Sequence, residues 1–176
     1  MLITLPAANI MDKAQRVAAH RHTPCSREEL KRLQELVPRL RELGVSRLVC
    51  SDLDAQSAEA LARRLNVPVE EWESLRRWNF GKLHGQYTAH ADDVRDRIAD
   101  RTVPVKGGDS RASFEKRCSA SAQRLQKIGD GCLLIVDEEV LEKLTGATGA
   151  VRYHLYAMEV QVGESDKAEA HIAATA

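Results

Sequence analysis

Two histidines near the amino end of the chain could do chemistry. His20 and His22 flank Arg21, just before a Thr-Pro step. A neutral imidazole can attack an electrophile or bind a transition metal. No second histidine or carboxylate stands beside them at the spacing by which a helix gathers metal ligands. We therefore expect solvent-facing loop histidines and no metal site, and a relocated nucleophile at His20 or His22 is the alternative hypothesis.

Three consecutive acids, Asp137, Glu138 and Glu139, follow the apolar run Cys132–Val136. Carboxylates at the end of a strand could hold Mg²⁺ or Ca²⁺, which prefer oxygen ligands. Acids are also favoured at the start of a helix, where the backbone N–H groups carry partial positive charge. We favour solvated acids at a helix start, and the cation hypothesis stays open. The sequence indicates no cofactor.

The elements that must position these side chains are short apolar strands alternating with amphipathic helices. A helix is predicted from Ser26 to Leu43, and Pro38 should bend it. The runs 46–50 and 132–136 predict buried strands, each followed by a helix, and a further helix is predicted over 110–128. This alternation predicts an α/β fold, a three-layer α/β/α sandwich around a mostly parallel sheet.

The carboxyl-terminal part of the chain has a different pattern. Val151 to Val162 alternates apolar and polar residues, so we predict an edge strand there, and an exposed edge would allow a homo-oligomer. From Gly163 onward the chain is rich in Ala, Glu and Asp. We therefore predict a single domain over residues 1–162 and a flexible tail over 163–176.

Composition limits the function classes. The chain has 176 residues, of which 43% are hydrophobic and 30% charged, which is typical of one globular domain. Its 26 basic and 26 acidic residues give a net charge of zero, which argues against nucleic-acid or membrane-surface binding. The four cysteines are far apart, as in proteins with reduced thiols. With no signal-like or membrane-spanning run, we expect a cytoplasmic protein.

Several short motifs occur in a characteristic order. Thr23-Pro24-Cys25-Ser26 opens the first long helix and Cys50-Ser51-Asp52-Leu53 ends a strand. Residues 75–85 read LRRWNFGKLHG, and residues 107–110 read GGDS, with Phe114 and Arg117 downstream. In order and spacing, residues 2–160 resemble the histidine phosphatase superfamily (phosphoglycerate mutase-like), with its TPLT, SSDL, LRExxFGxxEG and GES motifs. The resemblance implies a phosphoglycerate mutase-like fold.

The resemblance also implies a phosphoryl-transfer site. In the family one histidine attacks phosphorus, a carboxylic acid protonates the leaving group, and two arginines with a second histidine hold the phosphoryl charge. In this chain the five positions carry other residues, namely Leu5, Pro6, Ala55, Arg77 and Asp137. A proline at the nucleophile position has no nucleophilic atom, and an arginine at the acid position reverses the charge. We therefore predict that none of the family's catalytic residues is present.

One family position keeps its residue type. Arg16 falls where an arginine contacts the substrate phosphate, so it is the candidate phosphate-binding residue, although pairing with an acid such as Asp12 is the interpretation that we favour. We predict a non-catalytic domain that acts by binding a protein partner, a second copy or a small anionic ligand. The alternative is a phosphatase or phosphomutase that acts on a small phosphomonoester through an atypical site.

Overall fold

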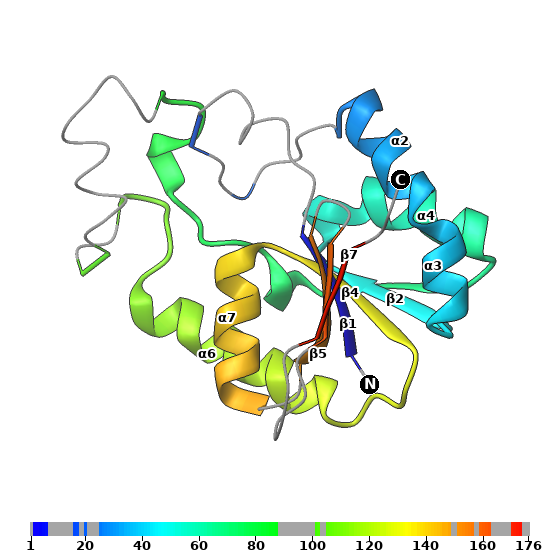
Figure 1. Ribbon diagram of the computed structural model, residues 1–176. Coiled ribbons are helices and arrows are strands. Elements are labelled where there is room, and N and C mark those ends of the chain that lie inside the picture. The colour runs from blue at the N-terminus through cyan, green and yellow to red at the C-terminus, as the bar shows by residue number, and fades with distance from the viewer. Residues whose placement is uncertain are drawn as a thin grey trace.

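The computed structural model describes residues 2–6, 16–17, 20, 25–87, 101–102, 105–148, 151–156, 159–162 and 170–173. Figure 1 shows helices on both sides of a central sheet. In chain order the elements are β1 (Leu2–Pro6), α2 (Arg27–Glu35), α3 (Val37–Glu42), β2 (Arg47–Cys50), η1 (Asp52–Asp54), α4 (Ala55–Leu65), β3 (Val69–Glu71), η2 (Glu73–Leu75), η3 (Gly81–Leu83), α6 (Arg111–Leu125), β4 (Cys132–Val136), α7 (Glu138–Thr148), β5 (Val151–Tyr156), β6 (Glu159–Val162) and β7 (Ala170–Ala173).

The sheet is mostly parallel, as predicted. Its strand order is β3-β2-β4-β1-β5-β6-β7. The five strands from β3 to β5 run parallel, and β6 and β7 are antiparallel to their neighbours. The carboxyl ends of β2 and β4 lie side by side, because Cys50 pairs with Ile135 in register. Groups that follow these two strands are therefore brought together at one edge of the sheet.

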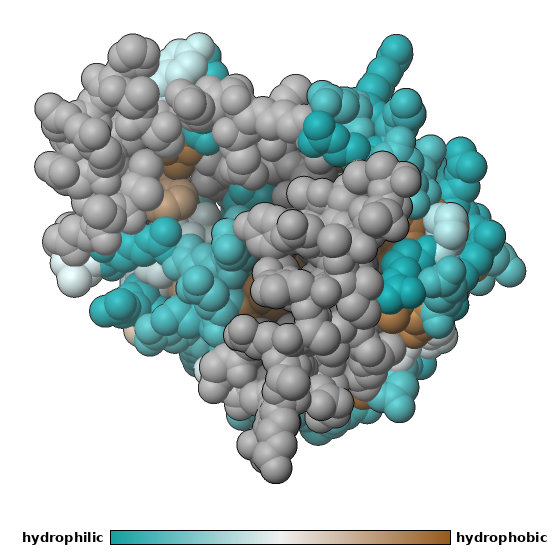
Figure 2. Space-filling model, in the orientation of Figure 1, coloured by the Kyte–Doolittle hydropathy of each residue, from teal (hydrophilic) through white to brown (hydrophobic). Residues whose placement is uncertain are grey.

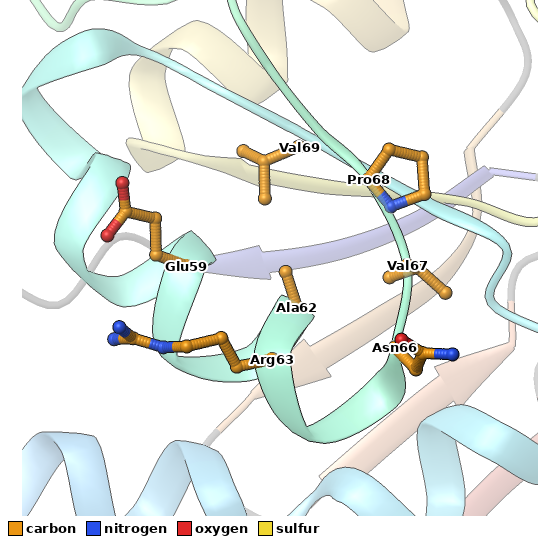
Figure 3. A pocket seen from close by; sticks show the side chains of 7 residues that line it. All are labelled: Glu59, Ala62, Arg63, Asn66, Val67, Pro68 and Val69. Atoms are coloured by element: carbon orange, nitrogen blue, oxygen red, sulfur yellow. The ribbon is translucent and has the colours of Figure 1, made fainter.

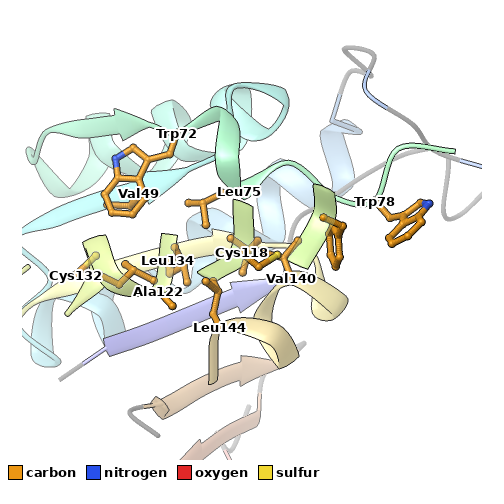
Figure 4. Packing of buried hydrophobic residues seen from close by; sticks show 13 residues of the cluster. Val49, Trp72, Leu75, Trp78, Cys118, Ala122, Cys132, Leu134, Val140 and Leu144 are labelled. Carbon is orange, nitrogen blue, oxygen red and sulfur yellow. The ribbon is translucent and has the colours of Figure 1, made fainter. Parts of the chain in front are cut away.

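Alternate residues of β2 and β4 serve opposite faces of the sheet, which is why both strands are apolar throughout. Leu48 and Leu133 pack with α2, α3 and α4 in one buried cluster. Val49 and Leu134 pack with α6 and α7 in a second cluster on the other side (Figure 4). The three-layer α/β/α architecture is thereby confirmed.

The first predicted helix is interrupted. α2 ends at Glu35 and α3 begins at Val37, one residue before Pro38. Proline cannot donate a backbone hydrogen bond, so the break falls where the bend was predicted. The predicted helix over 110–128 forms as α6, and its expected core residues are all buried: Phe114, Cys118, Ala122 and Leu125.

The prediction of an edge strand over Val151–Val162 is wrong in detail. This segment contains two strands, β5 and β6, and neither is at the edge, because β5 lies between β1 and β6 while β6 lies between β5 and β7. The edge strand near the carboxyl end is β7, which lies within the predicted tail 163–176. The sheet therefore continues past the predicted domain limit, and residues 151–162 offer no open edge for a homo-oligomer.

On the face in Figure 2 the described residues are mostly hydrophilic. Tyr87, 46% exposed, is the exposed large hydrophobic residue within the described ranges. No helix in those ranges is long and apolar enough to span a bilayer.

Candidate functional site at the carboxyl edge of the sheet

Two acids stand at the junctions where β2 and β4 give way to helices. Asp54 ends η1 and precedes α4, and Asp137 lies between β4 and α7. The hydroxyl of Ser51 donates to Asp54 Oδ2 over 2.5 Å, and the amide of Glu139 donates to Asp137 Oδ1 over 3.1 Å. Both carboxylates are thus fixed by local hydrogen bonds at neighbouring strand ends.

Asp54 is only 8% exposed. Burial raises the pKa of its carboxyl above the usual value, and the charge of Asp137 adds to the increase. The hydrogen bond from Ser51 and the charge of Arg77 act in the opposite direction and lower this pKa. The charges of Arg77 and Asp137 therefore both act on the carboxyl group of Asp54.

Arg77 brings a positive charge to this edge of the sheet. It follows η2, is only 7% exposed, and its Nη1 lies 3.7 Å from Asp137 Oδ2. In the resemblance, Arg77 stands at the position of the catalytic acid and Asp137 at the position of the second histidine. These two positions thus carry opposite charges and face each other.

A second arginine meets the start of α7. Arg101 forms an ion pair with Glu139, and its guanidinium carbon lies 4.8 Å from the ring centroid of Trp78 and 5.2 Å from that of Phe80. Burial lowers the pKa of Arg101, while the charge of Asp137 raises it. Asp137 and Glu139, with side chains 29% and 26% exposed, are therefore paired with arginines and only partly solvated, whereas full solvation was expected.

Asp137 accepts backbone amides at the start of α7, where acids were predicted to be favoured. Besides the amide of Glu139, which bonds to its side chain, Asp137 receives the amide of Leu141 on its backbone carbonyl over 3.0 Å. This is the position of a helix cap. Within the described ranges no three side chains of the His, Cys, Asp or Glu type are grouped as metal ligands. The carboxylates at this edge face guanidinium groups.

Arg76, which precedes Arg77 in the chain, pairs with a different acid. Arg76 donates from Nε and Nη2 to the two carboxylate oxygens of Asp52 over 2.7 and 2.6 Å, and from Nη2 to Glu73 over 3.0 Å. These bonds raise the pKa of Arg76. The Arg76 side chain is 25% exposed, so this bidentate pair lies closer to solvent than Arg77 does.

Arg117 of α6 anchors the loop that carries these arginines. Its guanidinium donates to the backbone carbonyls of Ser74, Arg76 and Arg77 and to Asp109 Oδ2, the last two over 2.7 and 2.8 Å. Asp109 Oδ2 also accepts the amide of Asn79 over 2.9 Å. The residues of the GGDS motif and of α6 therefore fix the main chain of residues 74–79.

Two glycines let the same loop approach the GGDS turn. A Cβ on Gly81 would lie 2.5 Å from the carbonyl oxygen of Lys106, and a Cβ on Gly108 would lie 2.5 Å from that of Asn79. Gly81 also has a positive φ of 51°. The glycines of both motifs thus have a packing reason that involves no ligand.

His20 lies at this loop, and the expectation of a solvent-facing side chain is wrong. Its Nε2 is 2.7 Å from the carbonyl oxygen of Arg77 and 4.0 Å from Asp109 Oδ2, and the side chain is 18% exposed. A carbonyl only accepts, so Nε2 carries the proton. Burial lowers the pKa of His20, which favours the neutral ring. His22 lies outside the described residues.

Arg16, the candidate phosphate-binding residue, is held by a backbone carbonyl and an aromatic ring. Its Nη1 donates to the carbonyl of Gly85 over 2.5 Å, and its guanidinium carbon lies 3.7 Å from the centroid of the Tyr87 ring. The backbones of Arg16 and Tyr87 also form an isolated antiparallel bridge. Asp12, its expected partner, lies outside the described residues. These contacts tie the segment at Arg16 to the end of the LRRWNFGKLHG motif.

The remaining family positions lie on the same edge. Leu5 and Pro6 form the carboxyl end of β1, where they pair with Ile135 and Val136 of β4, and Ala55 begins α4. The backbones of Leu5, Pro6 and Ala55 thus lie at the ends of β1 and at the start of α4. The core thiols add no nucleophile, because burial raises the pKa of Cys50 to about 12 and those of Cys118 and Cys132 to about 11.

A hollow lies elsewhere, at the amino end of β3 (Figure 3). Its volume is about 540 Å³, and the residues that line it are Glu59, Ala62, Arg63, Asn66, Val67, Pro68 and Val69. It is open and lies at the amino end of β3, whereas the junctions follow the carboxyl ends of β2 and β4, and β3 runs parallel to β2. The hollow is therefore separate from the site implied by the resemblance.

Sequence reasoning missed two members of the edge, Asp54 and Arg101. Asp54 directly follows the SSDL-like motif at a position to which the resemblance assigns no role, and its burial is what singles it out. Arg101 lies far from any motif in the sequence. A sequence shows which charges exist, whereas pairing across 38 residues, as between Arg101 and Glu139, depends on the fold.

Comparisons with known proteins agree with this geometry. The model of the histidine phosphatase superfamily (branch 1) matches residues 9–147, beginning just after Leu5 and Pro6. No curated protein matches the chain in sequence.

Solved structures share the fold. A mycobacterial glucosyl-3-phosphoglycerate phosphatase, in complex with VO3, is 21% identical with a TM-score of 0.67, over 83% of this chain and 78% of that chain. The alpha-ribazole phosphatase from Shigella flexneri is 16% identical with a TM-score of 0.68, over 80% and 75%. A protein from Thermus thermophilus is 16% identical with a TM-score of 0.67, over 98% and 99%. Since the family model covers most of its length, this chain belongs to the histidine phosphatase superfamily.

Proposed function

We propose that this histidine phosphatase domain does not transfer phosphoryl groups and acts by binding a protein partner or a small ligand. The observation that carries the proposal is the contact between Arg77 and Asp137, 3.7 Å apart, at the positions of the family's acid and second histidine. An arginine cannot protonate a leaving group at neutral pH. The two side chains neutralise each other where the family needs one proton donor and one cationic contact.

Three further features support the proposal. Leu5 and Pro6 offer no nucleophilic atom at the end of β1. Ala55 offers no positive charge at the start of α4. Where their charge is not neutralised, Asp54 and Asp137 oppose a phosphate dianion by about 1 kcal/mol or more each, even with partial screening. A phosphoryl group would therefore meet neither a nucleophile nor the cations that its transfer requires.

One observation favours the alternative, a phosphatase or phosphomutase with an atypical site. His20 reaches the loop that carries Arg77, and its lowered pKa favours a neutral imidazole, the form that attacks phosphorus. Two of the structural relatives are named as phosphatases of glucosyl-3-phosphoglycerate and of alpha-ribazole phosphate compounds, so small phosphomonoesters are the substrates to test.

The test is hydrolysis of a panel of small phosphomonoesters by the wild-type protein and by His20→Ala, with phosphate release as the readout. The proposal predicts no release above buffer for either protein. Release by the wild type that is lost in His20→Ala would establish the alternative instead. Release that persists in both proteins after repurification would contradict both hypotheses.

A further inference from the structure

The amino-terminal part of the chain is attached to the segment 75–86 at two points of different chemistry. At the first point, the amide of Val17 donates to the carbonyl of Gln86 over 2.9 Å, and the carbonyl of Val17 accepts the amide of Gly85 over 2.9 Å. At the second point, Nε2 of His20 donates to the carbonyl of Arg77 over 2.7 Å. Peptide groups do not titrate, whereas an imidazole titrates near neutral pH, so the second of these attachments is the one that can respond to pH.

The carbonyl of Arg77 is shared with a permanent cation. Nη2 of Arg117, on α6, also lies 2.7 Å from this oxygen, so the two nitrogens cannot be farther apart than twice that distance. The same Nη2 lies 2.8 Å from Asp109 Oδ2, which is 4.0 Å from Nε2 of His20. The negative charge of Asp109 is therefore already balanced by Arg117 while the imidazole is neutral.

A proton taken up from solvent binds to Nδ1 of the ring, because Nε2 already carries one, and turns the imidazole into a cation. Burial opposes this charge most, since the His20 side chain is 18% exposed. Arg117 and Arg76 also oppose it, whereas the hydrogen bond of Nε2 and the charge of Asp109 favour it. Together these effects hold the pKa of His20 below its ordinary value of 6.5 while the contact is closed.

We propose that the contact between His20 and the carbonyl of Arg77 is an acid-sensitive latch: uptake of a proton by the ring releases it from the loop after η2, and Val17 remains the hinge. In the released state, water replaces the carbonyl as the partner of Nε2, and the imidazolium is hydrated away from Arg117. The carbonyl keeps its hydrogen bond from Arg117, so the loop stays anchored while its His20 side opens. The latch does not depend on whether the edge of the sheet transfers phosphoryl groups.

The direction of the pH effect follows from proton binding. The released ring has the ordinary pKa of 6.5 and the latched ring a lower pKa, so the released state binds more protons. The latch therefore keeps its full strength above pH 6.5 and weakens as pH falls from 6.5 through the pKa of the latched ring. Because one proton is involved, the equilibrium between the latched and released states shifts by at most about tenfold per pH unit.

Nuclear magnetic resonance of the isotope-labelled wild-type protein tests the latch between about pH 8 and about pH 5, the range in which histidines titrate. Nuclear Overhauser contacts from the His20 ring to Arg77 and Asp109 report whether the latch is closed. The amide of Trp78 reports on the Arg77 carbonyl, because the two belong to one peptide unit. We expect the ring to titrate below pH 6.5, and the contacts to lose most of their intensity and the Trp78 amide to shift with the same midpoint.

Two variants make the test specific. His20→Gln keeps a side-chain N–H donor but has no titrating ring, so the Trp78 amide should lose the shift with that midpoint. His84→Gln removes a histidine from the other end of the motif and should leave the shift unchanged. The decisive measurement uses the wild-type protein and does not depend on the folding of either variant. Titration of His20 at or above pH 6.5 would overturn the latch, and so would titration below 6.5 during which its contacts with Arg77 persist.

Discussion

The loop after β3 is contacted by two charged regions, which use their charges in different ways. In the anchor region, Arg117 and Asp109 hold backbone carbonyls and an amide of residues 74–79. In the edge region, Arg77 and Asp137 face each other side chain to side chain, beside Asp54. The anchor region bonds side chains to main chain, whereas the edge region bonds side chain to side chain.

The difference shows which residues a fold requires and which a reaction requires. A guanidinium bonded to three carbonyls cannot be replaced without releasing the loop, so the anchor region keeps its residues whatever the protein does. Side chains that point at a substrate form no hydrogen bonds with the main chain of the protein. They can change together, provided that the new charges compensate one another, as those of Arg77 and Asp137 do.

The largest expected effect is in the anchor region. Arg117→Ala removes the donor to the carbonyls of Ser74, Arg76 and Arg77 and leaves Asp109, with its side chain 14% exposed, without its cation. We expect unfolding in urea to show a loss of about 3 kcal/mol, the usual cost of breaking a largely buried pair. The control Arg111→Ala, on the exposed side of α6, should cost less than about 1 kcal/mol. Similar losses in both variants would remove the distinction between the two regions.

A smaller effect on stability is expected where the GGDS motif touches the LRRWNFGKLHG motif. In Gly108→Ala the new Cβ would lie 2.5 Å from the carbonyl oxygen of Asn79, so the backbone must shift. We expect a loss of about 2 kcal/mol in the free energy of unfolding. Gly129→Ala, whose Cβ would meet no atom within 4 Å, is the matched control and should change it by less than about 0.5 kcal/mol. A tolerated Gly108→Ala would mean that this close approach is not required.

The smallest effect concerns pH and the edge region. The pKa of Asp54 is raised in the folded state by burial, so the folded state holds this proton at pH values where the unfolded chain has released it. The stability from this group is full below 3.8, the ordinary pKa of an aspartate, and is lost as pH rises through the pKa of Asp54 in the folded state. We expect urea unfolding at a series of pH values to show this decline in the wild type and not in Asp54→Asn. The same decline in both proteins would assign it to another group.

The sequence predicted the parts of the fold that depend on local patterns. The apolar runs of β2 and β4 and the core face of α6 formed as expected. β3 was missed, because three residues that include Glu70 and Glu71 carry no alternating apolar pattern. The edge position of β7 was missed too, because strand order depends on pairings between distant segments.

The candidate site was predicted only in part. The motif spacing identified Arg77 and Asp137 as changed positions, and the fold brings them together. It gave no indication that they would pair, that Asp54 would be buried beside them, or that His20 would reach the carbonyl of Arg77. The pair of Arg77 with Asp137 and the contact of His20 with Arg77 join residues 60 and 57 positions apart, and spacing along the chain cannot specify them.

Binding of orthovanadate to the wild-type protein tests the central claim most directly, because vanadate adopts the geometry of a phosphoryl group in transfer. A structural relative, the mycobacterial glucosyl-3-phosphoglycerate phosphatase, has been solved with VO3 and serves as the positive control. Isothermal titration calorimetry should give heat for that enzyme and none above dilution for this protein, since Arg77 faces Asp137 where vanadate would need cations. Saturable binding at micromolar vanadate would contradict the account and show that a phosphoryl site remains.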